Sequence, residues 1–349
     1  MKVLIQPLIA HSVVNQADLI KKLLEQKGFI AEYRTTITLE EARSRDVHAV
    51  MWVTLATIQF LGDAVWVYLM LNKPKAVYVT IEGVPTKANV LYSNLPRLEF
   101  IANSRFTANC LTTVGLKVID VVHHAVDMDL ANAASKSSWR LRRKLEEKFK
   151  DKVKLLFVGR DDPRKALDKL NIALHMLVDE GIKDFALILH APLSAYQKFQ
   201  WLEEYGLVYH HGDFGSTSMY NVLQLMHACD YLVFPSVCEG FGLPVLEANA
   251  VGRPAIHAWI PPFDEFSSKE FNFVFNYLER RLVKCNPAQY WIFHDYPPEF
   301  LAEMIKYAIE VYKNSRSEYE EYCAKAKDHA KAWDYRKVYP RLLKHINIP

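Results

Sequence analysis

A single stretch, from Ala228 to Ile256, constrains the fold of this chain more strongly than any other part of the sequence. The apolar run Tyr231–Phe234 has the length and β-prone composition of a buried strand. A tight turn with two glycines follows at Glu239–Pro244, and Val245–Ala250 then has the pattern of a helix. Another apolar strand begins at Pro254. This order of strand, turn, helix and strand is typical of an α/β fold with a parallel sheet.

The turn itself has the features of an anion-binding site. Gly240 and Gly242 allow the backbone to approach a ligand closely, and a helix N-terminus presents unpaired N–H groups and positive dipole density. Such a site typically binds phosphate. Glu239 and Glu247 flank the turn, where they would repel a phosphate but would hold hydroxyl groups on either side of it. A phosphate between a sugar and a ribose describes a sugar nucleotide.

The motif EGFGLPVLEANAVGRPAI, in which seven residues separate Glu239 from Glu247, resembles the signature of glycosyltransferase family 4, one of the glycosyl transferases group 1. The resemblance implies a retaining enzyme with the GT-B fold. In that fold two Rossmann-like parallel-sheet domains face each other across a cleft, and a C-terminal helix crosses back to the first domain. We therefore expect an acceptor-side domain at residues 1–128, a nucleotide-sugar-binding domain at 129–332, and the returning helix at 333–349.

A second pattern supports the same donor. The segment Phe157–Lys165 is a strand that ends in glycine, followed by three cations within six residues and then by a helix. Cations at the start of a helix oppose its dipole, and an anionic ligand would resolve that conflict. The family carries a similar pattern, which implies that Arg160 and Lys165 hold the donor diphosphate. Ala166 stands where the family usually has glycine. The alternative is a solvated cluster of charges.

The resemblance also implies a role for each residue of the donor site. Glu239, Arg160 and Lys165 are expected to be catalytic, with Glu239 on the hydroxyls of the donor sugar and Glu247 on the ribose. The expected donor-binding residues also include Gly240, Phe241, Gly242, Leu243, Arg164, Asp213 and Phe214. Cations and backbone N–H groups would stabilise the negative charge on the departing diphosphate without a metal or another cofactor. Attack on the same face of the sugar then retains its configuration.

The first half of the chain alternates continuous apolar strands with helices, which predicts a parallel sheet covered on both faces. Within it, residues 49–71 are largely apolar, and we interpret them as a strand at Ala49–Val53 and a helix at about Thr57–Leu71. A membrane span is the alternative. Asp63 argues against it, because a carboxylate in mid-span costs about 2.5–3.5 kcal/mol on insertion scales.

The acceptor side departs from the family pattern. The loop Pro7–Ser12 has no glycine, and Glu82 stands where many members of the family have histidine. Glu82 is expected either to bind the acceptor or donor sugar or to cap the next segment, and both alternatives stay open. His11 lies in the loop on the same side. The acceptor is a glycan, a lipid or a small molecule.

Two further segments have alternative interpretations. Asp127-Met128-Asp129 formally matches the D-x-D pattern of metal-dependent glycosyltransferases, but beside the GT-B signature we expect no metal. The charged segment from Ala133 to Asp151 is interpreted as a solvated linker and helix. Its basic residues offer an alternative contact with acidic lipid: Arg140, Arg142, Arg143 and Lys144.

The composition of the chain limits the cellular locations and the classes of partner that we expect for it. A net charge of +3 and a pI of about 8.4 are too mild to indicate a nucleic-acid partner. Five scattered cysteines and the absence of a signal-peptide pattern favour the cytoplasm, with peripheral contact at the inner membrane face as an option. We therefore expect a metal-independent, hexosyltransferase-type enzyme. The alternatives are a non-catalytic GT-B binding module and a GT-B sugar-nucleotide epimerase.

Overall fold

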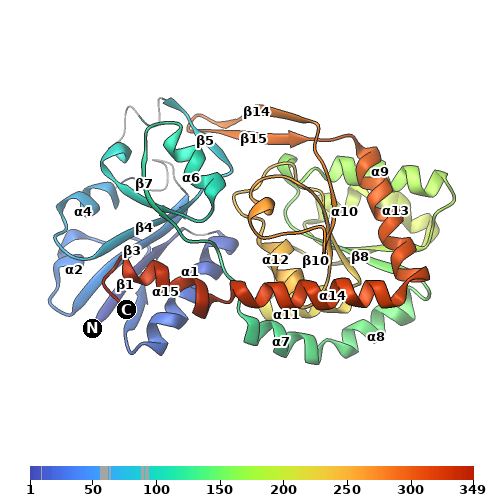
Figure 1. Ribbon diagram of the computed structural model, residues 1–349, viewed down its shortest axis with the longest axis horizontal. Coiled ribbons are helices and arrows are strands. Elements are labelled where there is room, and N and C mark those ends of the chain that lie inside the picture. The colour runs from blue at the N-terminus through green and yellow to red at the C-terminus, as the bar shows by residue number, and fades with distance from the viewer. Residues whose placement is uncertain (9, 56–61, 63, 88–89, 91–93) are drawn as a thin grey trace.

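The computed structural model describes residues 1–8, 10–55, 62, 64–87, 90 and 94–349. The chain forms two lobes that lie side by side, each built around a six-stranded sheet (Figure 1). Every neighbouring strand pair recorded in these two sheets is parallel. The predicted pair of Rossmann-like parallel sheets is therefore confirmed. The lobes are called the first and second domain below, and their boundaries at residues 128 and 332 stay a prediction.

The first domain has the strand order β2-β1-β3-β4-β6-β7. Its strands are β1 Lys2–Pro7, β2 Ile30–Tyr33, β3 Val47–Leu55, β4 Lys75–Thr80, β6 Glu99–Ala102 and β7 Lys117–Val121. Its helices are α1 His11–Gln26, α2 Leu39–Arg43, α4 Ala64–Met70 and α6 Arg105–Thr112, with a 3₁₀ turn η1 at Leu95–Arg97.

Both faces of this sheet are buried, which explains why its strands are continuously apolar. On β1, Leu4 packs into one hydrophobic cluster together with residues of α2, α4 and α6, whereas Val3 and Ile5 pack into another with α1. Successive residues of a strand point to opposite faces, so β1 must be apolar at each of these positions.

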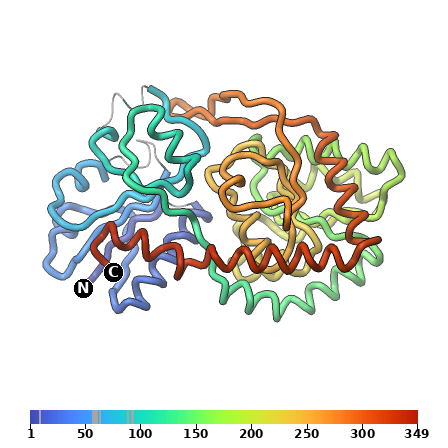
Figure 2. Tube along the Cα trace, viewed as in Figure 1, coloured from blue at the N-terminus to red at the C-terminus, as the bar shows by residue number. Residues whose placement is uncertain are grey.

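The C-terminal helix α15, Tyr335–Lys344, belongs to the first domain by its packing. Tyr335, Tyr339 and Leu342 are fully buried in the same cluster as Val3 and Ile5. Figure 2 shows the red end of the chain running from the second lobe back to the first, where it ends near the N-terminus. The predicted return of the last helix is confirmed.

The second domain has the strand order β10-β9-β8-β11-β12-β13. Its strands are β8 Val153–Val158, β9 Phe185–His190, β10 Val208–Gly212, β11 Tyr231–Phe234, β12 Ala255–Ala258 and β13 Phe273–Phe275. Its helices are α7 Met128–Ser137, α8 Trp139–Lys148, α9 Leu167–Asp179, α10 Leu193–Lys198, α11 Met219–Ala228, α12 Leu243–Ala250, α13 Pro298–Asn314 and α14 Arg316–Ala330. Short 3₁₀ turns are η2 Pro163–Lys165, η3 Gln200–Tyr205, η4 Phe263–Glu265 and η5 Lys331–Trp333.

A hairpin that the sequence patterns do not predict joins the two domains. Its strands β14, Glu279–Asn286, and β15, Gln289–Asp295, pair antiparallel, and β15 also pairs antiparallel with β5, Gly83–Pro85, of the first domain. In Figure 1 the hairpin runs along the upper edge from one lobe to the other. A Cβ atom on Gly83 would lie 2.0 Å from the carbonyl oxygen of Tyr290, so only glycine allows this close pairing.

The apolar segment at residues 49–71 is part of the first domain. Its first part is the end of β3, and its last part is α4, which begins at Ala64. Residues 57–61 and 63 of the predicted helix lie outside the described residues. Within the described part of the chain, no helix combines the length and the apolar character that crossing a bilayer requires.

The charged segment after residue 127 forms two helices rather than a linker with one helix. α7 and α8 both pack against α11 of the second domain. Arg142 does not belong to the exposed basic surface that the sequence suggested, because its Nη2 atom lies 3.1 Å from Oδ1 of the buried Asp230. Arg140, Arg143 and Lys144 are exposed.

Candidate active site

The strand order of the second domain determines where a ligand can bind. From the neighbouring strands β8 and β11 the chain winds outward in opposite directions. The loops that leave the carboxyl ends of such a pair diverge, and the crevice between them is the usual ligand site of a doubly wound sheet. The loop after β8 carries Arg160–Lys165, and the loop after β11 carries Glu239–Pro244. This topology brings together two motifs that are far apart in the sequence.

A cavity of about 280 Å³ lies at this point, between the two domains, and is called the central crevice below. It gathers nearly all of the residues that the sequence predicted for the site. The predicted residues that line it are His11, Glu82, Arg160, Arg164, Lys165, Phe214, Glu239, Gly240, Phe241, Gly242 and Leu243. Further side chains of the first domain that line it are Ser12, Val13, Leu55, Thr80 and His124.

The two motifs meet in a buried ion-pair network. Lys165 Nζ lies 2.5 Å from Glu239 Oε1, and Arg164 Nη1 lies 3.4 Å from Glu239 Oε2. Burial alone would raise the pKa of Glu239, but the charges of Lys165 and Arg164 hold it below its ordinary value. Glu239 is therefore a carboxylate in the ligand-free protein. Arg160 is exposed at the mouth of the crevice, where it is open to a ligand.

Gly242 fixes the shape of the turn after Glu239. Its φ angle is +89°, and a Cβ atom at this position would lie 2.0 Å from the Phe263 ring. An L-residue would have to adopt a left-handed conformation and push Phe263 aside. The helix α12 begins directly after Gly242. In its first turn Pro244 has no N–H group and the Val245 N–H group donates to the Gly242 carbonyl oxygen at 3.1 Å, so Gly242 and Leu243 are the residues whose backbone this helix start offers to the crevice.

Gly240 brings the same turn against the first domain. A Cβ atom on Gly240 would lie 2.4 Å from Thr80 Oγ1. The Gly240 carbonyl oxygen accepts hydrogen bonds from Asn103 Nδ2 at 3.2 Å and from Ser104 Oγ at 3.3 Å. The turn is therefore held from both domains, and no side chain stands between its backbone and the opposite wall.

Phe241 and Asp213 differ from the other predicted donor-binding residues in where their side chains lie. The Phe241 ring stacks on Phe266 with centroids 4.7 Å apart, so this residue contributes its backbone to the turn. Among the described residues, Phe214 lines both the crevice and the pocket beside it, whereas Asp213 lines neither. Asp213 is exposed, with its Oδ1 atom 3.7 Å from His210 Nε2.

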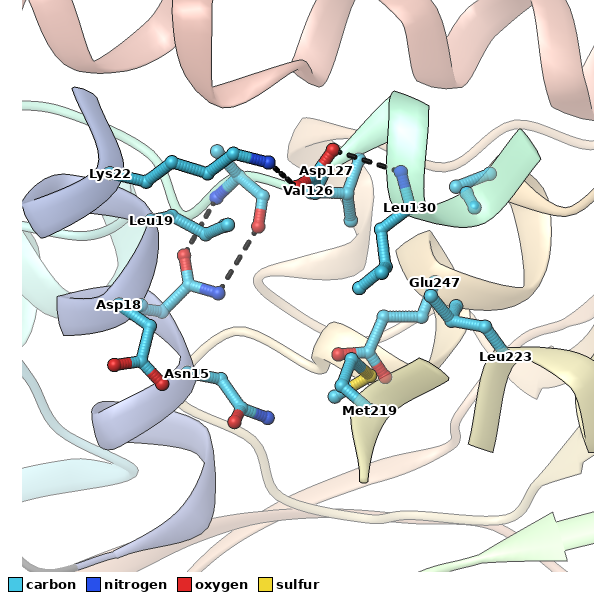
Figure 3. Close-up of a pocket in the computed structure, with 14 residues that line it drawn as sticks. Asn15, Asp18, Leu19, Lys22, Val126, Asp127, Leu130, Met219, Leu223 and Glu247 are labelled. Carbon is cyan, nitrogen blue, oxygen red and sulfur yellow. Dashed lines mark hydrogen bonds and ion pairs between the residues drawn. The ribbon is translucent and has the colours of Figure 1, made fainter. Parts of the chain in front are cut away.

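Glu247 lies where two further pockets meet. A side pocket of about 90 Å³ shares His11, Phe214 and Leu243 with the central crevice and reaches Glu247. A rear pocket of about 220 Å³, shown in Figure 3, begins on the other side of Glu247. The three cavities therefore adjoin one another.

The Glu247 carboxyl group is 8% exposed, and burial raises its pKa to about 7. Figure 3 shows the group turned from α12 into the space that faces Asn15 and Asp18 of α1. No ion pair or hydrogen bond of this carboxyl group is recorded among the described residues. A buried carboxyl group of this kind needs a hydroxyl or another donor from a ligand.

His190 is a site residue that the sequence interpretation missed. It ends β9, next to the switch point, and lines the side pocket. Within the described part of the chain neither ring nitrogen has a hydrogen-bond partner, and burial lowers the pKa of the ring to about 4. The sequence did carry one signal for this role: His190 is at the carboxyl end of a parallel strand, where ligands of such sheets usually bind. Asn15, Thr217 and Trp291 were also missed.

The D-x-D carboxylates have structural contacts. Asp127 Oδ1 caps α7 by accepting from the N–H groups of Asp129 and Leu130, each at 3.0 Å, and its Oδ2 atom lies 2.6 Å from Lys22 Nζ. Asp129 pairs with Arg336 at 2.7 Å. Among the described residues, no group of three or more His, Cys, Asp or Glu side chains is arranged to hold a metal ion.

With this geometry established, the chain can be compared with known proteins. A family model described as glycosyl transferases group 1 matches residues 138–281. The uncharacterized glycosyltransferase 335 of Sulfolobus islandicus rod-shaped virus 1 is 30% identical over 284 residues, which is 81% of this chain and 83% of that relative. The chain belongs to the glycosyl transferases group 1 and is a glycosyltransferase.

Other similarities are more limited. A D-inositol 3-phosphate glycosyltransferase from Mycobacterium sp. strain KMS is 30% identical over 145 residues, which is 40% of this chain and 31% of that relative. The crystal structure of HepE from Anabaena in complex with UDP-glucose aligns with a TM-score of 0.72 and 16% identity, over 99% of each chain. A glycosyltransferase from Rickettsia africae aligns with a TM-score of 0.73 and 14% identity, over 99% of this chain and 97% of that one. These structures show that the fold is GT-B.

Proposed function

We propose that the protein transfers a hexose from a nucleoside-diphosphate sugar to an acceptor hydroxyl, with retention of configuration and without a metal ion. The observation that carries this proposal is the meeting of Arg160, Lys165 and the N-terminus of α12 in one crevice, with the unpartnered Glu247 beside it. The cations and the helix N-terminus suit a diphosphate, and the carboxyl group suits the ribose hydroxyls. The Anabaena neighbour was solved with UDP-glucose, which supports a donor of this class.

The charges of the crevice suggest how the reaction proceeds. As the bond between the anomeric carbon and the diphosphate oxygen breaks, negative charge grows on the departing diphosphate. Arg160, Lys165 and the N–H groups of the turn stabilise this charge. The acceptor oxygen bonds to the anomeric carbon on the face that the diphosphate leaves, and its proton passes to the diphosphate. Glu239 then accepts hydrogen bonds from the sugar hydroxyls.

Lys165 and Glu239 are paired with each other in the ligand-free protein, and this pairing has a consequence for binding. A diphosphate that approaches Lys165 competes with the Glu239 carboxylate. When the sugar hydroxyls reach Glu239 and the phosphate reaches Lys165, both charged groups keep a partner. A free nucleoside diphosphate supplies the phosphate without the sugar, so we expect it to bind more weakly than the intact donor.

A thermal-shift panel of UDP, GDP, ADP and their glucose derivatives tests the donor site. We expect one base to raise the melting temperature and the corresponding sugar nucleotide to raise it further. Glu247→Ala removes the ribose contact and should abolish most of the shift, whereas Glu204→Ala, an exposed change elsewhere in the same domain, should preserve it. If no member of the panel stabilises the wild-type protein, the proposed donor site is wrong.

Two measurements test the finer parts of the proposal. The anomeric configuration of the first product, followed by NMR, should match that of the donor. The transfer rate should be the same with EDTA as with Mn²⁺ or Mg²⁺. A rate that requires the cation and that falls in Asp127→Asn would contradict metal independence.

The location is part of the proposal. All five cysteines are free, which suits the reducing cytoplasm. Peripheral contact with the inner membrane face would use the exposed residues Arg140, Arg143 and Lys144 of α8. Sedimentation with anionic vesicles, and its loss in an Arg140→Glu, Arg143→Glu variant, tests that contact.

A further inference from the structure

Trp291 lines the central crevice, although it belongs to the hairpin and follows both donor motifs along the chain. Its position follows from the pairing of β15 with β5, in which Trp291 lies opposite Gly83. Because Gly83 has no side chain, the backbone of β15 can lie directly against it. This register places the indole next to Glu82, the residue that precedes Gly83.

Contacts from two parts of the second domain, the hairpin and the loop after β8, hold Glu82. Trp291 Nε1 donates to Glu82 Oε2 at 3.3 Å, and Arg164 Nη2 lies 3.1 Å from Glu82 Oε1. The Ile292 N–H group of β15 also donates to the Glu82 carbonyl oxygen, at 3.3 Å. The Glu82 side chain nevertheless remains 24% exposed and lines the crevice, so its oxygens can accept further hydrogen bonds.

Arg164 connects this pair to the donor motif. Its guanidinium group contacts Glu82 on one side and Glu239 on the other. The two carboxylates raise the pKa of Arg164 despite its burial. Glu82 and Trp291 therefore lie across Arg164 from the carboxylate that is proposed to hold the donor sugar.

The chemistry of this corner suits a sugar ring. An indole offers apolar surface to the C–H groups of a pyranose, and a carboxylate accepts hydrogen bonds from its hydroxyls. A negatively charged acceptor is disfavoured at this corner, because the group that it would meet is the Glu82 carboxylate and the neighbouring cation, Arg164, is already shared between Glu82 and Glu239. A neutral carbohydrate satisfies the indole and the carboxylate together.

We propose that Trp291 and Glu82 form the acceptor subsite and that the acceptor is an uncharged carbohydrate. This inference rests on the proposed function, because it takes the rest of the crevice to hold a nucleotide sugar. Trp291 binds the acceptor ring and Glu82 orients its hydroxyls, one of which attacks the anomeric carbon. The hairpin thereby determines which acceptor is used, while the motif residues hold the donor.

Three variants test the subsite: Trp291→Ala, Trp291→Phe, and the control Tyr290→Ala. Tyr290 is the adjacent aromatic residue of β15, its side chain points to the opposite face of the strand, and it does not contribute to the described lining of the crevice. Two quantities are measured for each variant. The first is the Kd of UDP, GDP or ADP, whichever the wild-type protein binds, by calorimetry. The second is kcat/KM for transfer to a panel of p-nitrophenyl glycosides.

We expect Trp291→Ala to lower kcat/KM for the glycoside by about 10-fold to 100-fold, mainly by raising KM, as the loss of one buried aromatic contact would. The Kd of the nucleoside diphosphate should stay within about twofold of the wild-type value, since the indole does not reach the diphosphate in this arrangement. Trp291→Phe should recover most of the transfer, and Tyr290→Ala should behave as the wild type in both assays.

Three results would overturn the inference. Equal losses of nucleotide affinity and transfer in Trp291→Ala would assign Trp291 to the donor site. A wild-type protein that binds the nucleotide but transfers only to a polyprenyl phosphate in vesicles, or to none of the glycosides, would exclude an uncharged sugar acceptor and leave the proposed function intact. A wild-type protein that binds no nucleotide or nucleotide sugar would overturn the proposed function, and this inference with it.

Discussion

The two sheets of the molecule are built alike but differ in where their strand order reverses. In the second domain the reversal lies between β8 and β11, and the loops there carry Arg160, Lys165 and Glu239. In the first domain it lies between β1 and β3, where the loop after β1 brings His11 and Ser12 to the crevice and β3 ends at Leu55. The same architecture thus presents a charged edge on one side of the crevice and a nearly neutral one on the other.

Under the proposed function, this difference reflects what each of the two substrates would demand of the protein. A diphosphate needs cations, close backbone N–H groups and glycines at fixed positions. An acceptor hydroxyl needs far less, and in this chain the charged group on the acceptor side, Glu82, comes from the loop after β4, away from the reversal. Four substitutions test the contrast, beginning with the one expected to have the largest effect.

Lys165→Ala should lower kcat by about 10²-fold to 10³-fold, because a positioned charge next to the departing diphosphate is lost. In this variant the buried Glu239 keeps its ion pair with Arg164 but loses the one with Lys165. Steady-state kinetics with the preferred sugar nucleotide measures the loss. Lys169→Ala, which removes a lysine paired with Asp295 outside the crevice lining, is the control and should stay within about threefold. Equal rates for the two variants would show that the charged edge has no catalytic role.

Gly242→Ala should destabilise the protein by more than about 3 kcal/mol, because the new Cβ atom meets Phe263 in addition to the cost of a left-handed conformation. Gly252 has a similar φ of +74°, but a Cβ atom there would lie 3.5 Å from its nearest neighbour. Gly252→Ala should therefore cost only about 1–2 kcal/mol. Thermal melting of both variants measures the difference. Similar losses would mean that the Phe263 contact relaxes and does not fix the turn.

Glu247→Gln should raise the stability of the donor-free protein at pH 8 by roughly 3 kcal/mol and leave it nearly unchanged at pH 4. Its pKa of about 7 in the folded protein exceeds the usual value of 4.5, so folding favours the protonated carboxyl group. That favourable contribution is present below about pH 4.5 and is lost as the pH rises to 7. Melting temperatures at both pH values measure it. Glu299→Gln, at an exposed glutamate, should show no such dependence on pH.

The same group affects donor binding in the opposite direction. Ribose hydroxyls bind the ionised carboxylate best, so the affinity for the nucleoside diphosphate should rise up to about tenfold between pH 6 and pH 8. In the Glu247→Gln variant the phosphate of the ligand still ionises over this pH range, but the side chain at position 247 no longer does. A pH dependence that is unchanged in this variant would contradict the assignment of Glu247 to the ribose.

His11→Ala should have the smallest effect, lowering nucleotide affinity by less than about fivefold, since it removes an edge-to-face contact with Phe214 and no charge from the diphosphate site. Calorimetry measures this change, and His175→Ala, whose ring stacks on Trp201 away from the crevice, serves as the control. A loss as large as that of Lys165→Ala would show that the first domain also carries the donor.

The sequence allowed most of the residues that line the crevice to be predicted, because they belong to motifs with residue types at fixed spacing; their roles toward a donor stay a prediction. The glycines, Lys165 and both glutamates lie along the crevice and the pocket beside it. The two parallel sheets and the return of α15 were also predictable, from continuous apolar strands and from the family resemblance.

The remaining features depend on tertiary contacts that leave no local pattern. The hairpin strand β14 is mostly exposed and charged, so it lacks the alternation of a half-buried strand. The strand β5, which pairs with the other hairpin strand β15, has only three residues, and the paired residues lie about two hundred positions apart in the sequence. His190 looked like an ordinary strand residue, because the strand order that places it next to the crevice is not encoded in its neighbours. Asp213 and Phe214 were both expected at the donor site from their position alone, and of the two Phe214 lines the crevice.

The shared sheet of β5 and β15 has a mechanical consequence. The two domains are joined by this sheet at one edge and by the crossing chain near Val126, which pairs with Asp334, at another. Two bodies connected at two separate places can rotate only about the line through those places. A rotation that opens the crevice would also have to break the hydrogen bonds that Asn103 and Ser104 make with the Gly240 carbonyl oxygen.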